Sequence, residues 1–229
     1  MDITEKMSMG ASNAVVATMN AALKEEMSAP HMTYNFECVG PREECRAEYI
    51  QLRDQVEALL DEADEMEDVG LLEAADGLIR QAAEIQARMA TMTEVKWSEN
   101  VPNVVTNTGR NDVLDKYFKG SAYTAAWYLG LKGTGSAAAG DTLASHAGWS
   151  EVTPYSGSRK AITWGTTSSQ SNTATAVSFS ITGSATVAGG FITTASSGTS
   201  GTLYSASDFA SSRTVANGDT LNVTPTVSD

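Results

Sequence analysis

Two runs of apolar residues that repeat every seven positions constrain the fold of this chain most strongly. One run extends from Cys45 to Met66 and the other from Leu71 to Met92, each in steps of four and three. A 4-3 alternation kept over three heptads is typical of helices that bury a narrow apolar seam against other helices. The seam residues singled out by this pattern are Tyr49, Leu52, Val56, Leu59, Leu71, Leu78, Ile85 and Met89.

The two runs do not share a register, because Met66 and Leu71 are five residues apart. Neither an α-helix nor a coiled coil absorbs such a step without a stutter. Gly70 lies inside the step, and glycine readily adopts the left-handed conformation that ends helices. We therefore expect an antiparallel helical hairpin with its turn at 67–70, which associates into an oligomer because two helices alone leave faces exposed. The alternative is one long helix with a stutter, which would form a stalk.

The composition changes near Trp97. Residues 1–96 carry 20 acidic and eight basic side chains, whereas residues 97–229 carry eight and seven. An acidic half repels phosphate and a nearly neutral half does not attract it, so no nucleic-acid partner is expected. The acidic run at 61–68 lacks the Asp-x-Asp-x-Asp-Gly spacing of a calcium loop, and we interpret it as a solvated helix face.

The second half is rich in Ser, Thr and Gly, and it is patterned for short strands. Val177, Phe179 and Ile181 alternate with polar residues, as in a half-buried strand. Turn signals such as Asn217-Gly218-Asp219 separate the segments. Pro225 is expected at an edge strand or a strand end. The expected strands are 123–131, 161–164, 173–182, 186–193, 201–205 and 220–227, and a short helix is expected at 111–119.

The predicted fold class is α+β, with an N-terminal helical region followed by an antiparallel β-sandwich or jelly-roll-like domain. Residues 1–40 are expected to hold an amphipathic helix at Ser12–Met27 and a connector, because His31–Gly40 shows no clear period. Residues 41–96 form the helical hairpin or coiled-coil oligomerisation region, and Pro41 marks its start. Residues 97–229 form the β domain.

Neither a secretory signal nor a membrane span is visible in the sequence. The first residues lack a basic region followed by an apolar core, and the apolar stretches near Ala14–Leu23 are far too short to cross a bilayer. The protein is therefore expected to be made in a host cytoplasm and to stay soluble, with no membrane partner. Cys38 and Cys45 are expected to be free thiols there, with Cys45 a small buried residue of the seam.

No catalytic, cofactor or metal site is predicted, and the chain is not expected to be an enzyme. Asp141, Ser145 and His146 are close in sequence, but no Gly-x-Ser-x-Gly elbow supplies a nucleophile. We interpret His146 as a structural histidine beside a packed Trp149. The two histidines and two cysteines lack the spacing of zinc sites.

Aromatic side chains of the β half are the candidate sugar-binding groups. Tyr128, Trp149, Tyr155 and Trp164 are of the type that stacks on sugar rings. Packing in the core and between subunits is the favoured interpretation for all four.

Six sequence blocks carry a resemblance over residues 101–229. The most specific is the block with Asp141, Thr142, Ser145, His146, Gly148 and Trp149, together with the ending Gly-Asp-Thr-Leu-Asn-Val at 218–223. The other blocks are 107–111, 127–131, 158–160 and 200–204. This order of motifs resembles a family of β-rich virion proteins of tailed bacteriophages, whose members are capsid decoration (cement) proteins, head fibres and other structural proteins. The helical region before Trp97 is not part of the resemblance.

The resemblance implies a capsid decoration protein on the outside of the virion, bound to the major capsid protein as a homotrimer. Such a protein stabilises the shell because it binds only the assembled form. The alternative is a tail- or head-fibre or receptor-binding module that contacts host glycans through its aromatic residues. A third hypothesis, a glycan-cleaving enzyme, would require two acidic side chains facing each other across a cleft.

Overall fold

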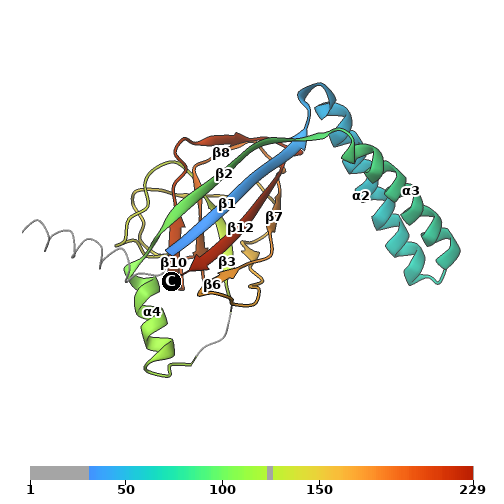
Figure 1. Cartoon of the computed structure of the whole chain (residues 1–229). Helices are drawn as coiled ribbons and strands as arrows, with labels where there is room; N and C mark the ends of the chain where they lie inside the picture. Colours follow the sequence, from blue (N-terminus) through green and yellow to red (C-terminus); the bar gives the residue numbers. More distant parts are fainter. Residues whose placement is uncertain (1–30, 123–125, 229) are drawn as a thin grey trace, which may run out of the picture.

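The computed structural model describes residues 31–122 and 126–228, so the helix predicted at Ser12–Met27 lies outside the described residues. The fold is α+β, as predicted: a helical hairpin projects from a domain built on a large antiparallel sheet (Figure 1). The helices are η1 (Glu43–Cys45, a single 3-10 turn), α2 (Arg46–Asp68), α3 (Leu72–Ala90) and α4 (Asn107–Tyr117).

Twelve strands are present in the described residues. They are β1 (His31–Pro41), β2 (Thr93–Val105), β3 (Tyr128–Lys132), β4 (Glu151–Val152), β5 (Lys160–Ala161), β6 (Ser171–Thr173), β7 (Val177–Ser180), β8 (Ala185–Val187), β9 (Gly189–Thr193), β10 (Leu203–Ser207), β11 (Arg213–Val215) and β12 (Thr220–Ser228).

The long strand β2 joins the two halves of the sheet. Its first part pairs with β1, which in turn pairs with β12, and its last three residues pair with β10. The order along the sheet is β4-β3-β9-β10-β2-β1-β12-β6, with β5 on β3 and β7 on β12. The halves face each other across one apolar core, where the Tyr34 hydroxyl of β1 lies 2.5 Å from the Ser205 hydroxyl of β10.

The prediction that His31–Gly40 is a connector is wrong, because these residues form β1 in the middle of the sheet. Met32, Tyr34, Phe36 and Cys38 are all buried, and the residues between them are not. This is the period of two that a half-buried strand requires. The pattern is short, and it ends in a register shift between Cys38 and Val39. The described N-terminal residues therefore belong to the β domain.

The helical hairpin is confirmed, and the single long helix is excluded. The chain reverses at Gly70, whose φ is +80°, and the amide of Leu71 donates to the carbonyl of Met66 at 2.9 Å. Because β1 and β2 are neighbouring antiparallel strands, the whole hairpin is the connection between them (Figure 1). It is an insertion into the sheet rather than a separate N-terminal region.

Most of the predicted seam closes inside one chain. Val56, Ala82 and Met89 are buried against one another, and Tyr49, Leu52, Leu59 and Ile85 pack around them. Leu78 is half-buried, whereas Leu71 is 53% exposed at the turn. The role of these residues in an oligomer stays a prediction.

Each predicted strand overlaps a strand of the structure, although the strand predicted at 161–164 shares only Ala161 with β5, and two of the predicted strands are divided. The segment 173–182 forms parts of β6 and β7, with Val177, Phe179 and Ile181 buried as predicted. The short helix α4 is present but begins four residues earlier than predicted, at Asn107.

Pro225 was expected at an edge or a strand end, which is wrong, because it lies inside β12 with β1 on one side. On the other side of β12, the Pro225 carbonyl accepts a hydrogen bond from the Ala174 amide. Pro225 lies between the residues of β12 that pair with β6 and those that pair with β7. The sheet requires no N–H group from this position, so proline is tolerated there.

Candidate functional site

A buried carboxylate fixes the helical hairpin to the β domain. Asp219, only 2% exposed, lies in the turn before β12 and receives the Lys96 ammonium at 2.9 Å and the Arg46 guanidinium at 3.3 Å. Its second oxygen accepts from the backbone amide of Ala216 at 2.9 Å. Three elements therefore meet at this group, since Arg46 begins α2, Lys96 belongs to β2 and Asp219 precedes β12.

Two neighbours complete this junction. Gly40 has no room for a side chain, because a Cβ there would lie 2.1 Å from Asp219 Oδ1. The Cys38 thiol lies 3.9 Å from Asp219 Oδ2. Burial, and then the nearby charge of Asp219, raise the pKa of this thiol to about 12. Cys38 is thus a protonated core residue rather than a reactive one.

The block with Asp141, His146 and Trp149 forms a tightly bonded loop. The Asp141 carboxylate accepts from Trp149 Nε1 at 2.9 Å and from the Ala138 amide at 2.9 Å. The His146 ring stacks on Trp149 with centroids 4.0 Å apart, and its Nδ1 lies 3.0 Å from the Trp149 carbonyl oxygen. Thr142 and Ser145 are bonded to each other through their backbones. The geometry agrees with the structural interpretation of His146.

This loop is also fixed by its packing against the β domain. Trp149 packs on Phe191 of β9, and Gly148 leaves no space for a side chain because a Cβ there would lie 2.8 Å from the Ser136 carbonyl oxygen. The fully buried Lys132 pairs with Asp208 at 2.7 Å beneath the loop. The six residues singled out in this block therefore stabilise a loop.

A second buried cation, Arg159, stabilises the region of the block 158–160, which is another of the blocks that carry the resemblance. Arg159 makes two bonds to the Glu151 carboxylate, at 2.9 and 2.7 Å. It also donates to the carbonyls of Ala195 and Gly198. Two strand connections are thereby tied to β4 through one side chain.

The candidate sugar-binding aromatics are mostly part of the core. Trp149 is 6% exposed and Tyr155 is 5% exposed, and Tyr128 is half-buried within β3. Trp164 is also half-buried, in the wall of a cavity. The favoured packing interpretation is therefore confirmed for Trp149 and Tyr155.

The described residues contain no group of three or more His, Cys, Asp or Glu side chains arranged to hold a metal ion. None of the helices in the described part of the chain has the length and apolar character of a membrane span.

Two surfaces stand out instead because they expose large apolar side chains. The first is the hairpin tip, which we define as Val69, Leu71 and Leu72, with exposed fractions of 71%, 53% and 63%. Sequence reasoning placed Leu71 in the seam and did not single out the other two, although their position beside Gly70 was a usable signal. Isolated apolar residues are normal on a surface, but a contiguous group on a projecting turn indicates a contact site.

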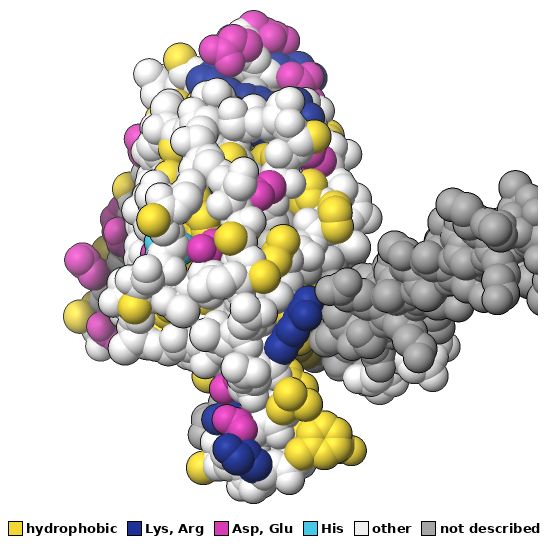
Figure 2. All heavy atoms as spheres, turned by 90° about the vertical axis from the view of Figure 1, so that its left-hand side faces the viewer, with side chains coloured by type: hydrophobic (Ala, Val, Ile, Leu, Met, Phe, Trp, Pro, Cys, Tyr) yellow, Lys and Arg dark blue, Asp and Glu magenta, His cyan; other side chains and the backbone are white. Residues whose placement is uncertain are grey.

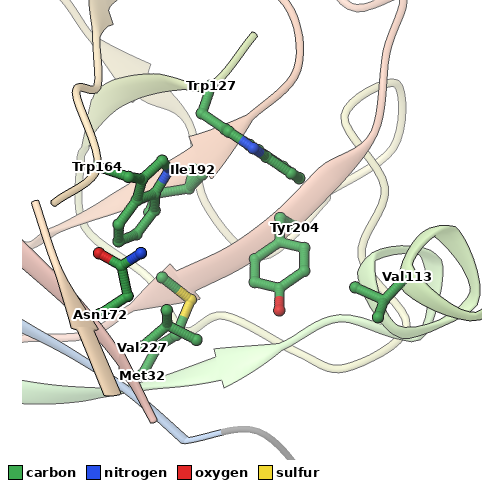
Figure 3. A pocket seen from close by; sticks show the side chains of 8 residues that line it. All are labelled: Met32, Val113, Trp127, Trp164, Asn172, Ile192, Tyr204 and Val227. Carbon is green, nitrogen blue, oxygen red and sulfur yellow. The ribbon is translucent and has the colours of Figure 1, made fainter. Parts of the chain in front are cut away.

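The second surface is the α4 groove, which we define by a cavity of about 220 Å³ and an adjoining hollow of about 280 Å³ that share Val113 and Trp127. Figure 3 shows the aromatic rings of Trp127, Trp164 and Tyr204 around the cavity. Tyr117 and Phe118 at the end of α4 are 81% and 75% exposed, and Figure 2 shows hydrophobic side chains gathered on this protrusion. Sequence reasoning missed this surface, because its residues come from distant segments.

Helix α4 is held rigidly against β10. The buried Thr106 caps the helix by accepting from the Gly109 amide at 3.0 Å. Gly109 lies so close to β10 that a Cβ would be 2.5 Å from the Tyr204 carbonyl oxygen. The α4 groove is therefore a preformed feature of the β domain.

Comparison with known proteins points to a phage virion. A search of curated proteins gave no match to the chain. Residues 104–227, more than half of the chain, match the model of a family described as podophage GP4 fiber I protein gp80. The match covers α4 and the strands from β3 onward, and it leaves out the helical hairpin. The blocks that resembled phage structural proteins are thus placed in a fibre family, and the chain belongs to the podophage GP4 fiber I protein gp80 family of virion structural proteins.

Proposed function

We propose that this fibre-type virion protein uses its helical hairpin as an arm that attaches it to another protein of the phage particle. The observation that carries the proposal is the placement of the hairpin between two adjacent strands. Its base is fixed to the domain by the Arg46–Asp219 ion pair, and its tip is apolar and exposed. A rigid projection with an unburied apolar end is suited to insertion into a pocket of a partner.

The net charge of the arm indicates what kind of partner surface would be complementary to it. Residues 43–90 carry 14 acidic and four basic side chains. Arms of two copies would repel each other, because like charges brought together are unfavourable. The partner surface that fits the arm is an apolar pocket with a basic rim. The homotrimer implied by the resemblance remains part of the proposal, and its contacts between copies would lie on the nearly neutral β domains.

Capsid decoration is the second candidate function. The same arm is suited to docking on an assembled shell, with the major capsid protein as its partner. A fibre is present in a few to tens of copies on a virion, whereas a decoration protein is present in hundreds. Quantitative mass spectrometry of purified particles separates the two candidates.

The proposal does not include catalysis. The titratable groups of the most specific block are engaged in structure: Asp141 accepts from Trp149, and His146 is stacked on the same ring. Contact with host glycans finds little support, because two of the four candidate aromatics are buried.

Serine substitutions at the hairpin tip test whether the arm attaches the protein to the particle. A phage lacking the gene is complemented with the wild-type chain or with the double variant Leu71→Ser/Leu72→Ser, and incorporation into particles is measured. The matched control is Val95→Ser, which changes a 58% exposed valine elsewhere on the surface. We expect the tip variant to keep the wild-type melting temperature and to lose about tenfold or more of its incorporation. Equal incorporation of the tip variant and the control would refute the proposal that the arm attaches the protein to the particle.

A further inference from the structure

The α4 groove is an apolar surface whose floor is buried but whose mouth is open. Ile192 is fully buried and Tyr204 is 9% exposed, so the floor belongs to the core of the β domain. The rim on α4 is different, since Val113 is 40% exposed and Leu114 53%. A connected apolar surface of this kind is typical of a groove that receives an amphipathic helix.

One polar atom of the groove lacks a partner. Asn172 Oδ1 is buried and accepts no hydrogen bond from the described residues, although its amide nitrogen donates to Thr167 at 3.1 Å. In Figure 3 this side chain lies beside Trp164 on the wall of the cavity. A buried acceptor without a donor is unfavourable, so the occupant of the groove is expected to bring an N–H or O–H group.

We propose that the amphipathic segment Ser12–Met27 of the same chain docks in the α4 groove. The described chain begins at this place, because Met32, the second residue of β1, lines the cavity. Five residue steps separate Met27 from Met32, which span at most ~18 Å. A docked helix can therefore end near Met32 and extend toward α4 without any reversal of the chain.

The composition of the segment fits the groove. Val16, Met19, Leu23 and Met27 are spaced by three, four and four residues, which places them on one face of a helix. Sixteen helical residues extend about 24 Å, enough to cover both the cavity and the adjoining hollow. Asn20 lies next to this face and carries an amide N–H₂ that can donate to Asn172 Oδ1.

Docking within one chain is favoured over docking between copies, because a short link gives a local concentration in the millimolar range. The groove does not involve the hairpin arm, so this proposal goes beyond the proposed function and does not depend on it.

Hydrogen–deuterium exchange of the full-length chain tests the proposal. We expect the amides of residues 12–27 to exchange about tenfold or more slowly in the wild type than in Leu23→Asp. Thr18→Asp is the matched control, because position 18 lies opposite the apolar face and its substitution should leave the protection unchanged. Val113→Asp, a change at an exposed position of the groove, should abolish the protection as Leu23→Asp does.

Dependence on concentration distinguishes the occupants. Exchange is measured over an approximately hundredfold range of protein concentration, with the mass followed by light scattering. Protection that is constant over this range and present in the monomer supports docking within the chain. Protection that appears only as the mass rises would assign the groove to a neighbouring copy and overturn the proposal. Rapid exchange of residues 12–27 in the wild type at every concentration would also overturn it.

Discussion

Arg46, at the start of α2, makes an ion pair with Asp219, although the two residues are 173 positions apart in the sequence. The guanidinium is 16% exposed and the carboxylate 2%. Lys96 approaches the same carboxylate from β2. One buried negative charge therefore helps to fix the base of the helical arm on the β domain, together with the hydrogen bonds that Arg46 and Arg53 donate to Asn217.

Removal of that charge is expected to destabilise the protein. Asp219→Asn leaves Arg46 and Lys96 partly buried without a counter-ion, and breaking a buried pair in this way costs about 3 kcal/mol. Urea denaturation followed by circular dichroism measures the loss. Asp54→Asn removes the exposed pair with Arg53 and should change the free energy of unfolding by less than about 0.5 kcal/mol. Similar effects of the two variants would contradict the role given to Asp219.

Two glycine substitutions are expected to act in opposite directions. Gly40→Ala forces a Cβ to within 2.1 Å of the Asp219 carboxylate, so it should lower the melting temperature strongly. Gly77→Ala lies inside α3 with nothing within 4 Å of the new carbon, so it should stabilise the protein by about 0.5–1 kcal/mol. Thermal unfolding of both variants checks the prediction, and a stable Gly40→Ala protein would disprove the close packing at the junction.

Stability is expected to fall in alkaline solution. Burial, followed by the charge of Glu151, raises the pKa of Tyr155 from 10.0 to about 12, and burial raises that of Cys38 from 9.0 to about 12. The folded state keeps these protons, whereas the unfolded state releases them. The stabilisation is therefore complete below pH 9 and is lost between pH 9 and 12, with a slope of about 1.4 kcal/mol per pH unit for each group.

Tyr155→Phe isolates one of the two groups. The Tyr155 hydroxyl is buried and has no partner among the described residues, so its removal should cost little at pH 7. Above pH 10 the variant should lose stability less steeply than the wild type. Denaturant titrations at pH 7, 9, 10 and 11 give the comparison, and parallel curves for both proteins would show that Tyr155 does not contribute.

Arginine at position 159 is not expected to be replaceable by lysine. Lysine cannot form the two bonds to Glu151 together with those to the carbonyls of Ala195 and Gly198. Arg159→Lys should lower the free energy of unfolding by about 2 kcal/mol, because buried acceptors lose their donors. Arg80→Lys, on the exposed surface of α3, is the control that should leave stability unchanged. Equal stability of all three proteins would refute this account.

His146 is expected to contribute to stability rather than to chemistry. His146→Ala removes the stacking on Trp149 and the contact with its carbonyl, which should cost about 1–2 kcal/mol. Incorporation of the variant into phage particles should stay at the wild-type level at a temperature where it is folded. Loss of incorporation without loss of stability would assign a binding role to this histidine.

Local patterns in the sequence determined the hairpin, its turn at Gly70 and the buried face of Val177, Phe179 and Ile181, because each depends on neighbours only a few residues apart. The contacts of Asp141, His146 and Trp149 are local for the same reason, because their bonds are made within one loop, and the structural interpretation of these residues stays a prediction.

Tertiary structure alone decided the features that combine distant segments. The period of two in His31–Gly40 was too short to be recognised, and its role became visible only where β1 pairs with β2 and β12. The α4 groove joins Met32, Val113, Trp127 and Val227, which no sequence window contains together. Apolar periodicity states which side of an element is buried, but not which other element covers it. That choice depends on packing and charge pairing between segments far apart in the chain, as at Arg46 and Asp219.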